Sequence, residues 1–434
     1  MTKTYDTYKD SGIAWIGEIP SDWTLVDAKR ILKNEKKLAG VEADNYERLA
    51  LTLNGVIKRS KDDSEGLQPE KFESYQILGK NELVFKLIDL QNISTSRVGI
   101  SPYEGLVSPA YIVVKNRKSE DNKYYYYWYM NMYFTHVFNN LGGDGVRSAI
   151  NAQDLLSLKI PYISVEEQKS IASFLDKKCG EIDSLISLQE EMITELQAYK
   201  QSVITEAVTK GLNPNVQFID SQEEWLGEIP SDWELLPIRA LFTKRNKKND
   251  PIISKERLSL SIGIGITRYA DKTTNLDRFK EDFTAYQLAY PDDIVLNSMN
   301  MIVGAVGKSA FMGCVSPVYY VITAKEGVDP NFYAYLLNSP KIREVYHSLG
   351  RGIYAIERGE GRVNTCRLKV PYYDFSIIKV PVPSYEEQIK IATYLDEKTQ
   401  QIDSLIALKQ DKIAELKDYK KSVIYEYVTG KKRV

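Results

Sequence analysis

The sequence predicts an α+β protein in which two α/β domains, related by a pseudo-two-fold axis, are joined by two long antiparallel helices that form a coiled coil. One reason is that residues 164–168 (Ser-Val-Glu-Glu-Gln) return as residues 384–388 (Ser-Tyr-Glu-Glu-Gln), at an offset of 384 − 164 = 220. Another is that residues 15–23 return almost unchanged as residues 225–233, at an offset of 225 − 15 = 210. A repeat of long period that spans the chain determines its architecture.

Each copy of the Glu-Glu-Gln stretch is expected to begin a long helix. Ser164 and Ser384 are in N-cap positions, and Glu167 and Glu387 follow three residues later, where each carboxylate is expected to reach back to the cap N–H. Residues 165–208 contain no proline and one glycine over 208 − 165 + 1 = 44 residues, so an unbroken helix is about 66 Å long. Such a helix needs a partner for its apolar stripe.

The simplest partner for one long helix is the other. Apolar residues recur along both at steps of three, four or seven, which is coiled-coil spacing, although Gln189 and Lys200 interrupt it. The segment between the helices begins at the end of the first and ends at the start of the second, and antiparallel helices place these two points side by side. The residues expected to pack between the helices are Ile182, Ile186, Ile193, Leu196, Val203, Ile402, Ile406, Ile413, Leu416 and Val423.

The segments between the repeats are predicted to be α/β. Short apolar runs such as residues 83–85 and 110–114 alternate with turn residues, as strands do. Residues 123–138, which are rich in tyrosine, are predicted to form one helix. Exposed rings could stack on bases, but their helical spacing favours a place in the core. The predicted domains are residues 1–158 (variable part 24–155), the helical region 159–212, residues 213–378 (variable part 234–375) and the helical region 379–434.

The charge is unevenly distributed along the chain. Residues 160–210 carry five Lys/Arg against nine Asp/Glu, whereas residues 234–280 carry eleven against five. A polyanionic partner for the basic segments and a solvated lysine-rich surface both fit this pattern. Three cysteines without metal-ligand spacing, no signal peptide and no apolar run of membrane-spanning length lead us to expect a cytoplasmic protein.

The second variable segment contains an insertion. Gly350 matches Gly142 at an offset of 208, whereas Asp374 matches Asp154 at an offset of 220, so 220 − 208 = 12 residues are added between them. The insertion is rich in glycine and arginine. Glycine permits close backbone approach and arginine suits phosphates or guanine edges, so we expect this loop to contact a nucleic acid rather than only solvent.

A catalytic centre and a metal site are not predicted. The two histidines, His136 and His347, lie in no motif and are expected to pack. Residues 304–309 (Gly-Ala-Val-Gly-Lys-Ser) look like the end of a phosphate loop, but Ile302 replaces the required glycine, so a turn is expected there. Residues 263–265 (Gly-Ile-Gly) lack the third glycine of a dinucleotide fingerprint. A duplicated architecture without these motifs is typical of a binding subunit.

These features together resemble the specificity (S) subunit of type I restriction–modification systems. The matching residues are the paired segments 15–23 and 225–233, the Glu-Glu-Gln helix starts, the Ile-Asp-Ser-Leu-Ile segments at 182 and 402 and the Ser-Val-Ile segments at 202 and 422. The resemblance covers essentially the whole chain.

The resemblance implies two target-recognition domains, each of which reads one half of a bipartite, asymmetric site in double-stranded DNA. It implies that the helices set the spacer and dock two methyltransferase (M) subunits, which methylate adenine N6 with S-adenosylmethionine. With two restriction (R) subunits, such assemblies cleave DNA in an ATP-dependent reaction that uses Mg²⁺. The cofactors would belong to the partners, and this chain would bind none of them. Two major-groove readings about 34 Å apart are compatible with helices of the expected length.

Candidate DNA contacts are the polar and basic residues predicted to lie in loops and at strand ends. In the first variable segment they are Lys58, Arg59, Lys86, Asn92, Arg97 and Arg147. In the second they are Arg245, Lys247, Lys248, Arg268, Asn297, Asn300, Arg351, Arg358 and Arg362. Each could instead be a solvated surface charge, and phosphate contacts are expected to outnumber base contacts.

Two other functions compete with this interpretation. A fused methyltransferase or nuclease would transfer or cleave without a partner, and would need a cofactor or metal motif. A scaffold that binds no DNA would use the coiled coil alone. A bipartite methylation motif with a fixed gap distinguishes both from a specificity subunit.

Overall fold

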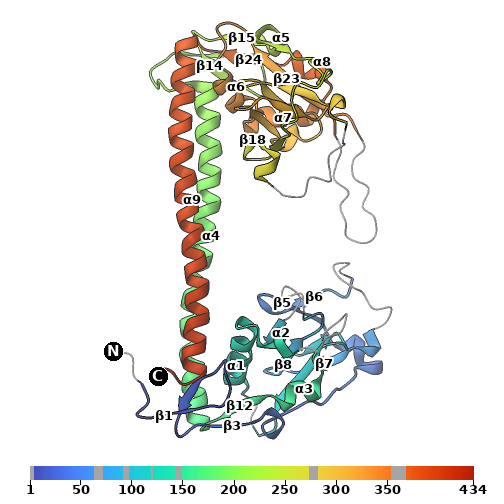
Figure 1. Cartoon of the computed structure of the whole chain (residues 1–434), viewed down its shortest axis with the longest axis vertical. Helices are drawn as coiled ribbons and strands as arrows, with labels where there is room; N and C mark the ends of the chain where they lie inside the picture. The colour runs from blue at the N-terminus through green and yellow to red at the C-terminus, as the bar shows by residue number, and fades with distance from the viewer. Residues whose placement is uncertain are drawn as a thin grey trace. The chain divides into compact units, whose positions relative to one another are not determined.

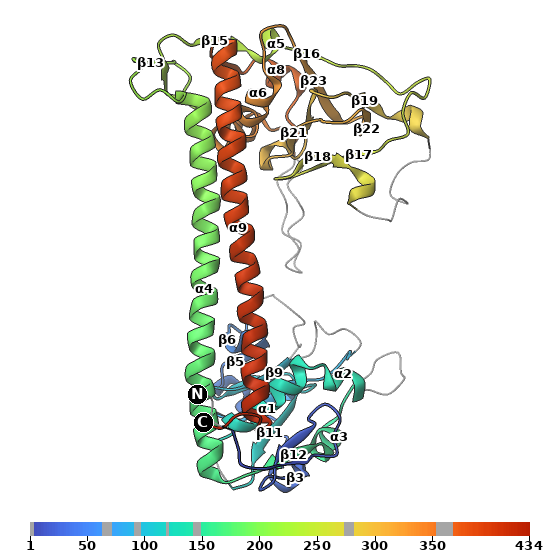
Figure 2. The same ribbon diagram turned by 60° about the vertical axis from the view of Figure 1, so that its left-hand side comes forward.

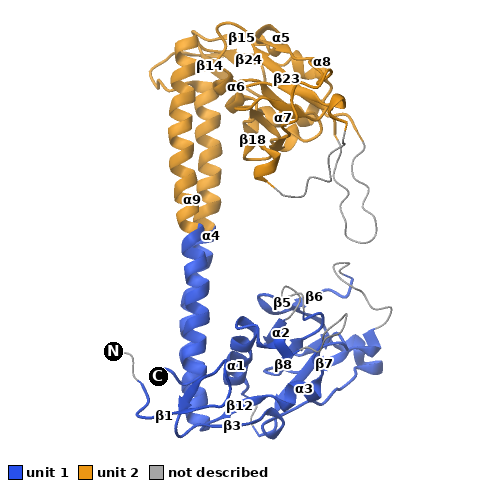
Figure 3. Cartoon of the chain, viewed as in Figure 1, with its two compact units in different colours: residues 1–190, 410–434 blue, residues 191–409 orange. Residues whose placement is uncertain are grey.

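The chain folds into two compact units. The computed structural model describes residues 4–62, 72–90, 97–118, 121–141, 149–272, 282–352 and 368–434. Unit 1 consists of residues 1–190 and 410–434, and unit 2 of residues 191–409 (Figure 3). The division falls inside both long helices, α4 (Val165–Lys210) and α9 (Tyr385–Val428), so that each unit contains a segment of each helix.

Unit 1 combines small sheets with short helices. One sheet has the strand order β6-β5-β10-β7, a second has β4-β11-β8-β9, and the pairs β1-β2 and β12-β3 stand alone. The strands are β1 Tyr8–Asp10, β2 Glu18–Pro20, β3 Thr24–Asp27, β4 Leu32–Lys33, β5 Arg48–Thr52, β6 Gly55–Arg59, β7 Gln76–Leu78, β8 Leu83–Lys86, β9 Arg97–Ile100, β10 Gly105–Val107, β11 Ile112–Asn116 and β12 Lys159–Tyr162. The α-helices before α4 are α1 Lys123–Phe134, α2 Val137–Leu141 and α3 Ala152–Ser157, and the 3₁₀ turns are η1 Ala28–Arg30, η2 Gly40–Asn45 and η3 Phe72–Ser74.

Unit 2 repeats this plan. Its four-stranded sheet β16-β23-β20-β21 corresponds to β4-β11-β8-β9, and its pairs are β13-β14, β15-β24, β17-β18 and β19-β22. The strands are β13 Phe218–Asp220, β14 Glu228–Pro230, β15 Glu234–Pro237, β16 Phe242–Lys244, β17 Leu258–Ser261, β18 Gly265–Arg268, β19 Gln287–Ala289, β20 Ile294–Asn297, β21 Val306–Lys308, β22 Gly313–Val315, β23 Tyr319–Ala324 and β24 Lys379–Val382. The helices are α5 Ile238–Leu241, α6 Pro330–Leu336, α7 Pro340–Leu349 and α8 Tyr372–Ser376, and the 3₁₀ turns are η4 Tyr269–Asp271, η5 Phe283–Ala285 and η6 Met301–Val303.

The correspondence between the units extends to single hydrogen bonds. In unit 1, the buried Gln76 amide donates to the carbonyls of Ser108 and Tyr111, at 2.9 and 2.7 Å. In unit 2, Gln287 donates to the carbonyls of Ser316 and Tyr319, at 2.8 and 2.5 Å. The duplication seen in the sequence is therefore a duplication of the fold.

The tyrosine-rich helix α1 belongs to the core of unit 1. Tyr124, Tyr125, Trp128 and Tyr129 are buried, and they pack with the strands and with α4, which confirms the predicted core role of this row. The prediction of one helix through Phe138 is wrong, because α1 stops at Phe134 and α2 begins at Val137. Between them His136 has φ 57°, a left-handed conformation that no helix interior accepts.

The segments of α4 and α9 run antiparallel within each unit, side by side in both views (Figures 1 and 2). In unit 1, Asp183 accepts from Lys420 at 2.7 Å, and the rings of Phe174 and Tyr427 lie 4.3 Å apart. Residue numbers therefore increase along α4 in the direction in which they decrease along α9. All ten residues predicted to pack between the helices are buried or half-buried.

The capping-box prediction is half right. The Ser164 and Ser384 hydroxyls accept from the N–H groups of Glu167 and Glu387, at 3.2 and 3.3 Å. The two carboxylates do not serve as the second half of the box in the described chain. Glu167 accepts from the Trp23 indole at 3.3 Å, and Glu387 accepts from the Trp233 indole at 3.1 Å. A buried indole N–H needs an acceptor, and the neighbouring helix start supplies it.

Three smaller predictions concern His136, His347 and the glycine-rich motifs. Both histidines are exposed, so the packing role expected for them is wrong. Gly307 and Lys308 of the Gly-Lys-Ser sequence lie in strand β21 rather than at the start of a helix, after a turn in which Gly304 has φ 95°. This confirms the predicted turn. Gly263 lies in the turn between β17 and β18, with φ 78°.

Candidate nucleic-acid interface and helix surface

Basic side chains of unit 1 gather where two strand pairs lie close together. Arg48 on β5 faces Arg59 on β6 in the antiparallel ladder, and Lys86 on β8 faces Arg97 on β9. Burial, and then the neighbouring Tyr75, raises the pKa of Tyr111, and the charges of Arg97, Arg48 and Arg59 oppose this rise. The two pairs of facing basic residues concentrate positive charge at this edge of the sheet.

A shallow hollow of about 380 Å³ opens beside this edge. It is lined by Arg48, Arg59, Lys58 and Lys61 together with Glu47 and two uncharged residues. Lys58 is exposed, lies 2.5 Å from the Glu47 carboxylate and sits 5.1 Å from the ring centre of Tyr103. The hydrogen bond that Lys58 donates to Glu47 raises the pKa of Lys58, so its ammonium stays charged. Four cations against one carboxylate suit a polyanion.

In unit 2 the predicted contacts fall into two groups. Asn297 and Asn300 share the turn between β20 and η6, where Asn297 holds the N–H of Met299 at 3.1 Å and Asn300 is exposed. Lys247 and Lys248 are exposed in the segment after β16, whose backbone pairs with β19. Arg268 at the end of β18 is exposed, and its guanidinium lies 4.8 Å from the ring centre of Phe311.

Two predicted arginines of unit 2 are engaged with carboxylates. Arg245 forms two hydrogen bonds to Asp293, at 2.7 and 2.9 Å, and the Asp293 side chain is completely buried. This ion pair supports the fold, so we leave Arg245 out of the DNA contacts proposed below. Arg351 lies 2.6 Å from Asp374, although 73% of its side chain is exposed. The predicted contacts Asn92, Arg147, Arg358 and Arg362 lie outside the described residues, as does most of the inserted loop.

Sequence reasoning missed Arg48 and Lys61, which line the same hollow as Lys58 and Arg59. Arg48 is almost fully buried at the start of an otherwise apolar strand. Its position opposite Arg59 depends on the hairpin register, which the sequence alone suggests only weakly. Lys61 follows β6 and is held by the carbonyl of Ala43 at 2.8 Å, a contact between residues that are distant in sequence.

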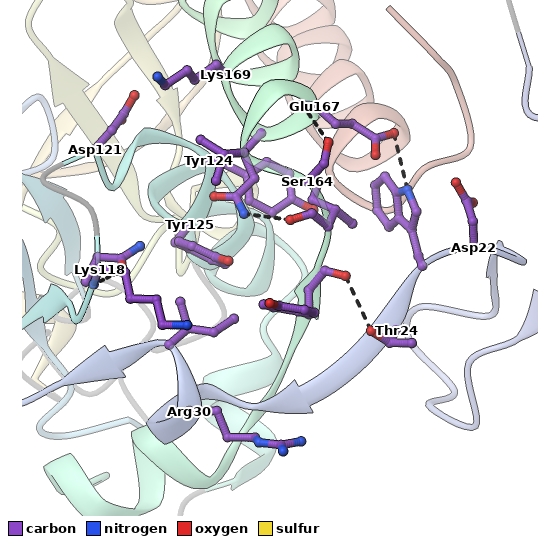
Figure 4. Close-up of a pocket in the computed structure, with 17 residues that line it drawn as sticks. Asp22, Thr24, Arg30, Lys118, Asp121, Tyr124, Tyr125, Ser164, Glu167 and Lys169 are labelled. Carbon is purple, nitrogen blue, oxygen red and sulfur yellow. Dashed lines mark hydrogen bonds between the residues drawn. The ribbon is translucent and has the colours of Figure 1, made fainter.

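A larger hollow of about 660 Å³ lies at the start of α4 in unit 1 (Figure 4). Arg30, Lys118 and Lys169 border it, and Tyr124 and Tyr125 form part of its wall. In Figure 4 the Glu167 carboxylate points toward the Trp23 indole, and the Ser164 hydroxyl lies at the helix start. The hollow therefore adjoins the contact that joins the body of unit 1 to its long helix.

The long helices carry a second surface that faces away from the bodies. Asp176 of α4 accepts from the Tyr127 hydroxyl of α1 at 2.8 Å, and this marks the helix face toward the body. Leu185 follows nine residues later, which is two and a half turns, so it projects from the opposite face. Leu185, Leu188 and Tyr419 of unit 1 are 47%, 49% and 50% exposed.

Unit 2 has the same surface. Leu405, Leu408 and Tyr199 stand at offsets of 220 from the unit 1 residues, and they are 47%, 64% and 53% exposed. Asp396, nine residues before Leu405, accepts from Tyr335 at 2.7 Å, as Asp176 accepts from Tyr127. We call the two sets, Leu185-Leu188-Tyr419 and Leu405-Leu408-Tyr199, the outer faces of units 1 and 2. Repeated exposed apolar clusters indicate interaction surfaces.

The described residues contain neither a cluster of three or more metal-ligating His, Cys, Asp or Glu side chains nor a helix with the length and apolar content needed to cross a bilayer. Of the three cysteines, Cys179 and Cys314 are buried and unpaired. Burial raises the pKa of the Cys179 thiol to about 11.

The chain is similar in sequence to proteins of one known family. Residues 26–198 match a family model described as the type I restriction modification DNA specificity domain. A protein of Methanocaldococcus jannaschii, named as the specificity subunit of type I restriction enzyme MjaX, is 28% identical over 96% of this chain and 96% of its own length. The MjaVIII specificity subunit of the same organism is 24% identical over 96% and 94%.

A solved structure shares the fold. It describes complex assembly and conformational transition of the type I R-M system, and one of its chains superposes with a TM-score of 0.66. The superposition covers 95% of this chain and 99% of the other, at 14% identity. The predicted combination of α/β bodies with long helices is thus a known architecture.

Proposed function

Because the chain belongs to the family of type I restriction–modification DNA specificity subunits, we propose that each of its units reads one half of a bipartite, asymmetric DNA site. Members of this family recognise DNA and are not the catalytic components of their complexes. The observation that carries the proposal is that one structural frame occurs twice, with matching strand order, and holds two bodies of different surface chemistry. Two different readers yield an asymmetric site.

The basic edge of unit 1 is the proposed DNA contact of that unit. Lys86 and Arg97 face each other across the ladder, and Arg59 and Lys58 follow on the adjacent hairpin. In unit 2 we propose Lys247, Lys248, Arg268, Asn297 and Asn300. Arg351 keeps a partner in Asp374 and is proposed as a phosphate contact. Arginine and asparagine are the side chains that pair with guanine and adenine edges, and lysine mainly binds phosphates.

The outer faces of the helices are the proposed docks for two methyltransferase subunits, one on each unit. Three large apolar side chains per unit, exposed to about half, are unusual on a pair of helices whose other faces are already packed. Residues 165–210 carry five Lys/Arg and nine Asp/Glu, so the partner helices are expected to be basic and apolar. The methyltransferase subunits would bind S-adenosylmethionine and extrude the target adenine for N6 methylation. With two R subunits, which would use ATP and Mg²⁺, the complex would cleave DNA.

The experiment that tests two-part recognition is methylome sequencing of a host that expresses this chain with its methyltransferase subunit. We expect one bipartite motif with a fixed gap. Residues 24–150 are then exchanged for those of a relative, and one half of the motif should change while the other stays. Exchange of residues 234–375 is the matched control, which should change the other half. The modular reading fails if either exchange alters both halves or neither, and the absence of any motif refutes DNA reading altogether.

A second experiment tests whether the helices set the spacer. Seven residues inserted after Glu191 in α4 and after Asp411 in α9 keep the heptad pattern and lengthen each helix by about 10 Å. At 3.4 Å per base pair, the gap in the methylation motif should grow by about three base pairs. An unchanged gap in an active complex would show that the helices do not act as the ruler.

A further inference from the structure

Unit 2 contains a hollow at the end of α4. Its volume is about 460 Å³, and its lining includes Tyr199, Ala207, Leu212, Phe218 and Tyr394. Glu206 and Lys210 also line it, and the Lys210 ammonium lies 5.9 Å from the ring centre of Phe218. The aromatic and aliphatic part of this mixed lining suits a bulky apolar side chain rather than a free ion.

One difference between the repeats opens space at this place. Ala207 of α4 corresponds to Tyr427 of α9, because 427 − 207 = 220. In unit 1 the Tyr427 ring is buried and packs 4.3 Å from the ring of Phe174. In unit 2 the residue that corresponds to Phe174 is Tyr394, and it faces the small side chain of Ala207. Space that Tyr427 fills in unit 1 is therefore open in unit 2.

The hollow is continuous with the outer face of unit 2. Tyr199 belongs to both, with half of its surface exposed. Ser202 and Glu206 follow Tyr199 at steps of three and four residues, which keeps them on the same side of α4. A helix laid along Leu408, Leu405 and Tyr199 would thus reach the hollow with its next turns.

We propose that the hollow receives an aromatic or leucine side chain from the docking helix of a methyltransferase subunit, so that unit 2 binds its methyltransferase subunit more tightly than unit 1 and is occupied first. The proposal rests on the helix docking proposed above. Identical partners then meet two unequal docks, and assembly proceeds in two distinguishable steps. The acidic excess of α4, with Glu206 at the hollow, favours a basic residue beside the inserted side chain.

The test isolates each dock and measures its affinity for the purified methyltransferase subunit. Leu185→Asp/Leu188→Asp disables the outer face of unit 1 and leaves the unit 2 dock. Leu405→Asp/Leu408→Asp leaves the unit 1 dock. Sedimentation or native mass spectrometry should give a Kd at least about tenfold lower for the unit 2 dock, since a buried apolar side chain contributes on that scale.

Ala207→Tyr, which copies unit 1, should raise the Kd of the isolated unit 2 dock to that of the unit 1 dock. Ala407→Tyr makes the same chemical change at an exposed position of α9 that does not line the hollow, and serves as the control. Ala207→Leu fills less of the space and should give an intermediate Kd, and DNA binding confirms that each variant is folded. Equal affinities of the two docks, or an Ala207→Tyr variant that keeps the lower Kd, would overturn the proposal. If both aspartate backgrounds still bind two methyltransferase subunits, the helix docking itself is wrong.

Discussion

The four-stranded sheets of the two units differ most in how they hold one acidic residue. Asp293 precedes β20 in unit 2, and Glu82 precedes β8 in unit 1, and each accepts the N–H of the residue three positions earlier at 2.8 Å. Asp293 is completely buried, bonded to Arg245 and to the Thr323 hydroxyl at 2.7 Å. Its counterpart Glu82 lies at the edge of a network of more exposed charged side chains.

One partner of this acidic residue has the opposite charge in the two units. The ladders place Glu35 of unit 1 where unit 2 has Arg245, and Lys115 where unit 2 has Thr323. Lys115 lies 2.9 Å from Glu35 and 3.9 Å from Glu82, and the three side chains are 38%, 51% and 20% exposed. The same backbone frame thus accommodates two different arrangements of charge, one around a buried carboxylate and one that is partly exposed. The two bodies could therefore diverge in surface chemistry without loss of the fold.

The largest expected effect tests this contrast directly. Asp293→Asn leaves Arg245 without its buried partner and should lower the free energy of unfolding of unit 2 by about 3–5 kcal/mol. Glu35→Gln in unit 1 should cost much less, because exposed ion pairs contribute little. Amide hydrogen exchange in β20 measures the stability of unit 2, and exchange in β8 measures that of unit 1. Equal losses would mean that burial does not distinguish the two networks.

The next effect concerns the contact between each body and its helix start. Glu167 accepts from both Tyr5, at 2.6 Å, and Trp23, whereas Glu387 accepts from Trp233. Hydrogen bonds to a charged group contribute about 1.5–3 kcal/mol each, so Glu167→Ala should destabilise unit 1 by about 3 kcal/mol and Glu387→Ala should destabilise unit 2 by about half of that.

A spectroscopic measurement separates this contact from general destabilisation. Burial, followed by the hydrogen bond to Glu167, raises the pKa of Tyr5 well above its ordinary value. In Glu167→Ala, ultraviolet titration should show the Tyr5 phenol ionising at lower pH than in the unchanged protein. A Tyr5 pKa that does not move would contradict the role assigned to Glu167.

A smaller and equal effect is expected for the salt bridges between the helices. Lys200 lies 2.7 Å from Asp403, and Lys420 lies 2.7 Å from Asp183, at matched positions of the two units. Each pair is partly exposed and should contribute about 0.2–1 kcal/mol in a double-mutant cycle. The reversal Asp183→Lys/Lys420→Asp should restore the stability lost in either single variant. Clearly unequal coupling energies would show that the helices pack differently in the two units.

The smallest effect is a difference in acid response. Lys33, and then Lys115, hold the pKa of Glu35 at about 2, below its unfolded value of 4.5. A depressed pKa stabilises the folded state above the unfolded pKa, so this contribution is present above about pH 4.5 and fades as pH falls toward 2. The matched position of unit 2 holds Arg245 in place of a carboxylate. Carboxylate NMR of Glu35, compared with that of a Lys33→Met variant, checks the shift, which should shrink in the variant.

Repetition and periodicity made the long elements of the fold predictable. The 220-residue offset marked both helices, and the apolar spacing identified residues such as Ile182 and Ile402, which are buried. The tyrosine row was correctly placed in the core because its rings recur at helical spacing. These features follow from local rules that act within a few turns of chain.

Contacts between distant residues were not predictable. Glu167 matches a capping box in every local respect, yet its carboxylate bonds to Trp23, 144 residues away in sequence. The sequence suggests that Arg245 is a surface cation, whereas the fold places it beside the buried Asp293 at the start of β20. The break at His136 depends on how α2 packs into the core, and Ala207 becomes informative only when the antiparallel register sets it beside Tyr394. Each of these four features depends on which distant segments the tertiary structure brings together.

The indoles of Trp23 and Trp233 have a practical consequence. Each is almost fully buried, donates to a carboxylate at a helix start and belongs to one unit only. Their fluorescence therefore forms a pair of built-in optical reporters. With Trp15, Trp128 and Trp225 replaced by phenylalanine, and one of the two reporters removed in turn, the emission of the remaining indole would report when that unit separates from its helix, in real time and without an added dye.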